Sequence, residues 1–228
     1  MDNNYETNPE MHDFPDFFLV YRRWAKKKQV KDPAQINVYK DIANWSVGKS
    51  VIDAGCGIGV GTNIINHHAL GVLGVDLNPE NVAVANALYE GPKIKFMEMD
   101  LLKPPERPVG TFDVVACIEV IEHVEDYDLL LENLKRLGEE KRKTVYFISS
   151  PNRNNIKLKK DKPRNQYHVR EWTAGEFYEV MTKHFQFVTL YATDKPNIFD
   201  ESNLVDGDTP RTPLLAKCEG PIYTASTA

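Results

Sequence analysis

The sequence contains few cysteines and no long apolar segment. Its three cysteines, Cys56, Cys117 and Cys218, lie far apart, and no C-x-x-C pair occurs, which argues against a zinc knuckle or a disulfide framework. No window approaches the roughly 18 apolar residues of a membrane-spanning helix, and residues 1–10 lack the basic-then-apolar pattern of a secretory signal. We therefore expect a protein of the reducing cytoplasm without a membrane span.

Internal repeats and low-complexity tracts are also absent, so repeat architectures are excluded. The net charge is −5, but the basic residues are concentrated in two segments. Residues 22–31 hold six basic residues and no acid, and residues 151–166 hold six basic residues and one acid. Such segments either bind an anionic partner, including nucleic acid, or form solvated surface.

A glycine-rich turn is the most informative feature that is present. An apolar stretch runs through Asp53 into the glycines Gly55, Gly57 and Gly59, and a helix-like stretch follows at 62–68. Glycine lets a ligand approach the backbone closely, and the start of a helix offers unpaired N–H groups. The spacing is G-x-G-x-G, which differs from the G-x-G-x-x-G of dinucleotide-binding proteins.

Acidic residues recur at the ends of successive apolar stretches. They are Asp53, Asp76, Asp100 and Glu119. In an open parallel sheet the ligand lies at the carboxyl ends of the strands, so we expect all four acids to face one crevice. Asp76 follows Gly55 by about 20 positions, the offset at which an acid binds ribose hydroxyls.

These motifs resemble the class I S-adenosylmethionine-dependent methyltransferases over roughly residues 50–187. The resemblance rests on the glycine turn, on Gly74-Val75-Asp76, on Asp100-Leu101 and on the stretch from Phe112 to Glu119. It implies that the turn from Asp53 through Gly55, Gly57 and Gly59 holds the methionine part of the cofactor. It further implies that Asp76 and Leu77 lie at the ribose, that Asp100 and Leu101 recognise adenine, and that Glu119 belongs to the same cofactor site.

The alternation of elements predicts an α/β fold with a doubly wound, mostly parallel sheet. We expect strands near 50–54, 71–76, 93–99, 112–117, 144–149 and 186–192, a last strand at 214–218, and a loop at 193–213. Helices are expected near 60–68, 79–90, 126–138 and 173–184, with Asn78 before the second and a capping box of Thr173 and Glu176 at the start of the last. The family resemblance adds a seven-stranded Rossmann-like sheet whose final strand is antiparallel.

Two regions are expected along the chain. Residues 1–47 form a tail and a helical extension that acts as a substrate lid or covers the core. Within this extension, aromatic residues recur at helical steps after residue 14, and Pro33 opens a second helix that runs to Trp45. Residues 48–228 form the S-adenosylmethionine-binding methyltransferase domain.

The catalytic candidates lie in the stretch Glu119-Val120-Ile121-Glu122-His123. If it begins a helix, Glu119, Glu122 and His123 share one face. His123 can then be a general base whose tautomer is fixed by a carboxylate such as Glu122. The three side chains can instead hold a divalent ion with His168 as a fourth ligand, or Glu119 can hold the cofactor while His123 only packs locally. On sequence alone we favour the metal-free base.

The E-x-x-E-H stretch is similar to two subgroups of the family. One contains ubiquinone-biosynthesis O-methyltransferases and many enzymes that act on sugars or natural products. The other contains small-RNA 3′-terminal 2′-O-methyltransferases, and this second resemblance implies Glu119, Glu122, His123 and His168 as metal ligands. The RNA enzymes usually carry an aromatic residue where Arg170 stands, whereas the small-molecule relatives share the R-E pair.

We therefore predict an S-adenosylmethionine-dependent methyltransferase that methylates an oxygen of a small polar, sugar-like or anionic acceptor. The alternatives are a metal-assisted RNA 3′-terminal 2′-O-methyltransferase and a protein that binds S-adenosylmethionine without catalysis. The basic segments 22–31 and 151–166 are the places where nucleic acid would bind.

Overall fold

The computed structural model describes residues 33–103, 109–138, 144–154, 163, 165–194, 197–205 and 213–222, all of which lie in a compact unit from Pro33 to Ala228. The aromatic stretch expected to be helical after residue 14, the basic segment 22–31 and most of the basic residues in 151–166 lie outside the described residues.

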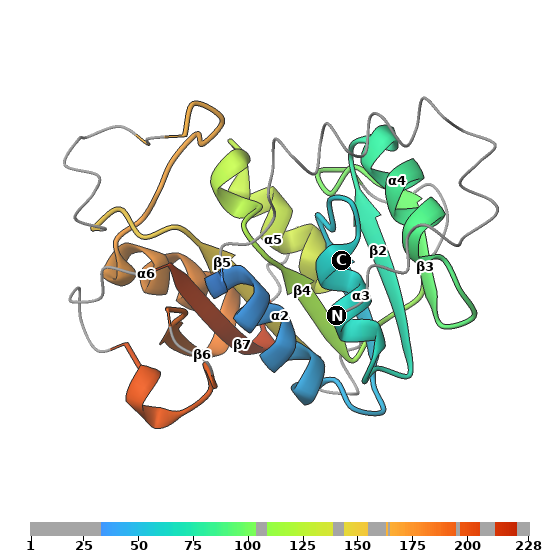
Figure 1. Cartoon of the computed structure of the whole chain (residues 1–228). Coiled ribbons are helices and arrows are strands. Elements are labelled where there is room, and N and C mark those ends of the chain that lie inside the picture. The colour runs from blue at the N-terminus through green and yellow to red at the C-terminus, as the bar shows by residue number, and fades with distance from the viewer. Residues whose placement is uncertain are drawn as a thin grey trace. The chain divides into compact units, whose positions relative to one another are not determined.

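The described strands form one seven-stranded sheet in the order β3-β2-β1-β4-β5-β7-β6 (Figure 1). The first five strands of this order pair in parallel, and β7 pairs antiparallel with both of its neighbours. The prediction of a mostly parallel sheet with an antiparallel last strand is therefore confirmed. The strands are β1 Ser50–Ala54, β2 Gly71–Asp76, β3 Ile94–Glu98, β4 Val114–Cys117, β5 Val145–Ser150, β6 Phe185–Ala192 and β7 Leu214–Pro221.

The middle of the sheet is buried on both faces. Every residue of β4 and of β5 is buried, which explains why both strands read as continuous apolar runs rather than as alternating patterns. The strand order reverses between β1 and β4, so the carboxyl ends of these two strands flank the crevice in which ligands bind in such sheets.

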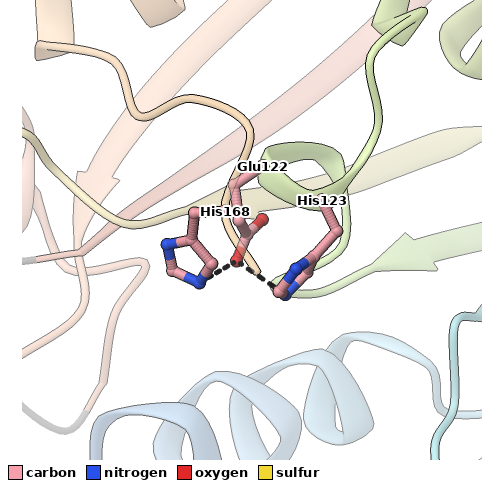
Figure 2. Close-up of side chains that lie close together, drawn as sticks. All are labelled: Glu122, His123 and His168. Carbon is pink, nitrogen blue, oxygen red and sulfur yellow. Dashed lines mark ion pairs between the residues drawn. The ribbon is translucent and has the colours of Figure 1, made fainter. Parts of the chain in front are cut away.

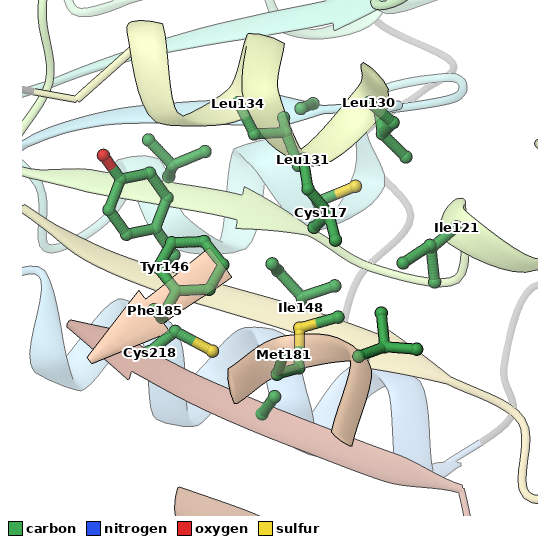
Figure 3. Close-up of a cluster of buried hydrophobic side chains, with 14 of the residues drawn as sticks. Cys117, Ile121, Leu130, Leu131, Leu134, Tyr146, Ile148, Met181, Phe185 and Cys218 are labelled. Carbon is green, nitrogen blue, oxygen red and sulfur yellow. The ribbon is translucent and has the colours of Figure 1, made fainter. Parts of the chain in front are cut away.

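Helices cover both faces of the sheet. On one face, α2 (Pro33–Trp45) and α3 (Val60–Asn66) bury side chains against the sheet, and α4 (Pro79–Tyr89) packs on β2 and β3. On the other face, leucines of α5 (Tyr127–Arg136) and Met181 of α6 (Ala174–His184) meet Cys117 and Ile148 of the sheet (Figure 3). This arrangement is the predicted doubly wound architecture.

Short side chains begin three of these helices. The Asn78 side chain accepts a hydrogen bond from the Glu80 N–H before α4, and Asp126 accepts one from Leu129 before α5. Thr173 and Glu176 form the capping box predicted for α6. Because these caps satisfy N–H groups that the helix itself leaves unpaired, they fix the residue at which each helix begins.

Two local expectations differ from the structure. The stretch after β4 forms only a single 3₁₀ turn, η3 (Ile121–His123), and α5 begins later, at Tyr127. The predicted loop at 193–213 contains a second 3₁₀ turn, η6 (Glu201–Asn203), and Leu204 bridges to Tyr191 of β6. None of the described helices is long and apolar enough to cross a membrane.

Candidate functional site

The glycine turn lies between β1 and α3, at the reversal of the strand order. Gly55, Gly57 and Gly59 all have positive φ, at 85°, 55° and 82°. A Cβ atom added to Gly55 would lie 2.3 Å from Cγ2 of Val120, and one added to Gly59 would lie 2.8 Å from the ring of Phe96. A Cβ atom on Gly57 would meet nothing within 4 Å. Gly57 is thus the glycine of this turn that borders open space.

Asp53 does not face the crevice as expected, because its side chain is buried on the helical side of the turn. Its carboxylate accepts hydrogen bonds from the hydroxyls of Tyr39 on α2, at 3.3 Å, and Thr62 on α3, at 2.6 Å. Burial raises the pKa of Asp53 to about 6, although both hydrogen bonds oppose this shift. Asp53 therefore ties two helices to the turn.

Asp76, at the end of β2, supports the turn from the other side. One carboxylate oxygen accepts from the Gly57 N–H at 2.8 Å, and the other accepts from the Asn78 N–H at 2.9 Å. Leu77 beside it is 62% exposed, so an apolar surface stands open next to the turn. These positions agree with a cofactor that lies along the carboxyl ends of β1 and β2.

Asp100 and Leu101 follow β3. The Asp100 carboxylate accepts from the Leu102 N–H at 3.0 Å and pairs with Lys103 at 3.0 Å. This backbone hydrogen bond, followed by the pairing with Lys103, lowers the pKa of Asp100. Asp100 is thus a charged group at the same edge of the sheet.

Glu119 lies at the end of β4 but does not share a helix face with Glu122 and His123. Its φ is 57°, a left-handed conformation that a helix does not allow. The Ser149 hydroxyl accepts from the Glu119 N–H at 2.9 Å and donates to its Oε1 at 2.8 Å. The expectation of a common helix face was wrong because the chain turns sharply after β4.

Glu122, His123 and His168 are brought together (Figure 2). Oε1 of Glu122 lies 3.9 Å from Nε2 of His123 and 4.0 Å from Nε2 of His168. The first two residues come from η3, and His168 comes from the loop before α6, whose Val169 N–H donates to the Glu122 carbonyl at 2.8 Å. One ligand atom from each of the three residues lies within 4.8 Å of the other two.

The carboxyl group of Glu122 is buried, and both of its oxygens lack a hydrogen-bond partner among the described residues. Burial raises the pKa of Glu122 to about 9, and the charges of Glu119 and Glu171 add to this shift. A buried polar group without a partner is costly, so its retention calls for an explanation.

Sequence reasoning missed several residues that support the site. Tyr39 and Thr62 bind Asp53, Ser149 binds Glu119, and Glu171 binds His168. Glu171 falls in the motif already noted, but the other three stand in ordinary helical or strand patterns. Their roles depend on which side chains meet in space, and the sequence pattern carries no signal for that.

The basic segment 151–166 is described only in part. Arg153 forms an ion pair with Glu176 at 2.5 Å, so its charge is paired with an acid of the same chain. The other five basic residues of the segment lie outside the described residues.

A doubly wound sheet of this strand order, with a glycine turn and acids at the ends of β1, β2 and β4, is the fold of the class I methyltransferases. A comparison with known protein families gives the same result. Residues 52–141 match the family described as a methyltransferase domain. The chain therefore contains a methyltransferase domain, and it is similar in sequence to S-adenosylmethionine-dependent methyltransferases.

Two curated relatives are similar in sequence. A probable S-adenosylmethionine-dependent methyltransferase of Mycolicibacterium smegmatis is 33% identical over 158 residues, which cover 69% of this chain and 57% of the relative. A ubiquinone biosynthesis O-methyltransferase of Pseudomonas paraeruginosa is 31% identical over 144 residues, 60% of each chain. The chain thus matches little more than half the length of these curated relatives.

A solved structure supports the fold. The magnesium protoporphyrin IX methyltransferase of Synechocystis PCC 6803, with bound S-adenosylhomocysteine, superposes with a TM-score of 0.62 at 18% identity. The superposition covers 91% of this chain and 97% of that one. At this identity the likeness concerns the fold alone.

Proposed function

We propose that the protein is an S-adenosylmethionine-dependent O-methyltransferase that acts on a small polar, hydroxyl-bearing acceptor with the help of a divalent cation. The observation that carries the proposal is Glu122, a buried carboxyl group without a hydrogen-bond partner among the described residues and with two imidazoles directed at it. The sequence alone favoured a metal-free base, since it could not reveal the burial of Glu122.

The donor set fits such a cation. One carboxylate oxygen and two imidazole nitrogens suit magnesium, manganese or iron better than a thiolate-rich site would. With ligand distances of about 2.0–2.3 Å, two ligands of one ion are separated by up to roughly 4.5 Å. The separations of 3.9 and 4.0 Å from Glu122 to the two histidines lie within this limit.

Different residues of the chain would bind the cofactor and the cation. The turn at Gly57 and the Asp76 carboxylate would hold the cofactor, while Glu122, His123 and His168 would hold the cation. When bound, a divalent cation lowers the pKa of a hydroxyl group near it. The methyl group on a sulfonium is already activated. For methyl transfer the protein has then only to align the acceptor oxygen and to exclude water.

A second candidate function is methylation of an RNA 3′ end. The residues that cluster here, Glu122, His123 and His168, are three of the four that the resemblance to the small-RNA enzymes implied as metal ligands. The fourth, Glu119, bonds to Ser149 instead. Arg170 replaces the aromatic residue usual in the RNA enzymes, and its guanidinium lies over the ring of Tyr127, 4.7 Å from the centroid. We therefore place the small acceptor first.

The cation is tested with manganese and a chelator. A crystal soaked in Mn²⁺ should show an anomalous peak between Glu122, His123 and His168, and chelation should abolish methyl transfer. If turnover survives chelation and His123→Ala still lowers the rate by about 10²–10⁴-fold, His123 is a metal-free base and the cation proposal fails.

The acceptor is tested by salt dependence. Binding of single-stranded RNA weakens steeply with salt, with a log–log slope of roughly −0.7 per phosphate contact. We expect weak RNA binding and no methyl incorporation into RNA, together with transfer to hydroxylated small molecules. Tight, salt-sensitive binding with methylation of the RNA 3′ end would instead promote the second candidate.

A further inference from the structure

The outer nitrogen atoms of the two clustered histidines are both occupied. Nδ1 of His123 lies 2.9 Å from the carbonyl oxygen of Tyr167, and Nδ1 of His168 lies 2.7 Å from Oε1 of Glu171. A carbonyl oxygen and a carboxylate only accept hydrogen bonds, so the ring proton of each neutral imidazole belongs on Nδ1. The lone pair of each ring then lies on Nε2, the atom directed at Glu122 (Figure 2).

A second contact assigns the same tautomer to His168. The amide nitrogen of Asn165 lies 2.9 Å from Nε2 of His168, and an amide NH₂ group can only donate. The orientation of this amide is itself fixed, because Oδ1 of Asn165 accepts from the Tyr167 N–H at 3.1 Å. Nε2 of His168 is therefore the accepting atom in the cation-free protein, and a cation that binds this nitrogen takes the place of the Asn165 N–H.

Glu171 is well placed to hold this arrangement. Its side chain is only 5% exposed and that of His168 only 11% exposed, so water competes weakly for the hydrogen bond between them. Next to Glu171, Trp172 accepts at its carbonyl from the Arg153 N–H at 2.9 Å, which anchors this end of the loop to the segment after β5. The carboxylate therefore meets the ring from a fixed position.

We propose that Glu171 is a positioning residue that fixes His168 in the Nδ1–H tautomer and thereby makes its Nε2 a ligand for the cation. This inference rests on the proposed function, because it assigns Glu171 a purpose only if the cluster binds a cation. Carboxylate groups that accept from the outer nitrogen of a metal-bound histidine orient the ring and increase its basicity. Tyr167 plays the same part for His123, but through its backbone carbonyl, which substitution does not remove.

The tautomer is measured first, in the full-length protein without metal. Long-range ¹H–¹⁵N NMR spectra of the histidine rings distinguish a protonated Nδ1 from a protonated Nε2, and loss of signals in His168→Ala assigns the ring. We expect Nδ1–H in the wild type and in Glu171→Gln, whose amide oxygen still accepts, and a shift toward Nε2–H in Glu171→Ala. A wild-type His168 that carries its proton on Nε2 would overturn the inference without any variant.

Affinity for Mn²⁺ alone is measured next, by calorimetry. Glu171→Ala should bind about 10–100-fold more weakly than the wild type, and Glu171→Gln should fall between the two. Glu179→Ala is the matched control. Glu179 is an exposed acid on α6, so its substitution should leave the tautomer and the Mn²⁺ affinity unchanged. Equal Mn²⁺ affinity in Glu171→Ala and the wild type would overturn the inference, whereas a wild type that binds no Mn²⁺ would overturn the proposed function itself.

Discussion

Glycines that stand two positions apart in the turn after β1 meet different surroundings. A side chain on Gly55 would collide with Val120, whereas one on Gly57 would enter open space. Both residues have left-handed backbone conformations. Packing therefore requires glycine at position 55, whereas at position 57 the space beside the backbone is open.

Alanine at the two positions should separate these roles. Gly57→Ala should fold at a cost of about 1–2 kcal/mol for the left-handed conformation, but it should bind S-adenosylhomocysteine much more weakly. Gly55→Ala adds a collision with Val120 and should lose roughly 2–5 kcal/mol of stability. Thermal unfolding and calorimetry measure both quantities. Undiminished cofactor binding by Gly57→Ala would show that the cofactor does not approach this glycine.

Glu122 leads to a second prediction at the residue scale. Because its pKa is raised to about 9, the cation-free protein holds it protonated at neutral pH, and glutamine has nearly the same shape and charge. Glu122→Gln should keep the unfolding temperature of the wild type and lose Mn²⁺ binding. Glu98→Gln, at an exposed position of β3, is the control that should keep both. Retained Mn²⁺ binding by Glu122→Gln would exclude this carboxylate as a ligand.

At the scale of elements, Asp53 joins β1 to two helices through hydroxyl groups. Tyr39 reaches it from α2 and Thr62 from α3. Tyr39 also covers Gly61 so closely that a Cβ atom there would lie 2.2 Å from its ring. The helix α2 is thereby packed against the same turn that borders the ligand crevice.

The pKa of Asp53 makes stability depend on pH. Its folded-state pKa of about 6 lies above the ordinary value of 3.8, so the folded protein holds the proton more tightly than the unfolded chain. This contribution is complete below about pH 4 and is lost as the pH rises through about 6, at about 1.4 kcal/mol per pKa unit. The loss is on the order of 3 kcal/mol.

Denaturant unfolding between pH 4.5 and 7 measures this effect. The stability of the wild type relative to Asp53→Asn should fall across that interval, because asparagine does not titrate. A difference between the two proteins that stays constant with pH would show that Asp53 titrates normally in the folded state.

Elements were easier to predict than contacts. The strand positions, the parallel sheet and the helix starts at Asn78 and Thr173 followed from apolar periodicity and capping residues, which act over a few neighbouring positions. His168 could be named as a candidate ligand, but its approach to Glu122 could not be derived from the sequence pattern, because it depends on a backbone hydrogen bond between Val169 and η3. The burial of Glu122 and the bond between Ser149 and Glu119 had no local signal, since residues far apart in sequence create them.

At the scale of the whole molecule, the sheet and both helical layers lie within residues 33–222. The helix α2 contributes Val38, Tyr39, Ile42 and Ala43 to the buried cluster on one face. Its role within the described residues is thus to cover the core. The predicted boundary at residue 47 and the lid proposed for the preceding segment stay predictions.

Two deletions test the division of the chain. A protein that begins at Pro33 should unfold cooperatively and bind S-adenosylhomocysteine, since it keeps every described element. A protein that begins at Gly48 lacks α2, exposes an apolar face of the sheet and should not fold stably. Circular dichroism and calorimetry report both properties. Loss of methyl transfer alone in the shorter deletion would support a lid, whereas loss of folding in that variant would place residues 1–32 in the core.

The position of β7 has a consequence for the order of folding. During synthesis β6 leaves the ribosome before β7, yet in the finished sheet β7 lies between β5 and β6 and pairs with both. The nascent chain therefore cannot extend its sheet strand by strand past β5. Until Leu214–Pro221 has been made, β5 presents an open edge and β6 lacks the strand that joins it to the sheet, so the last strand of the described chain is the one that closes the fold.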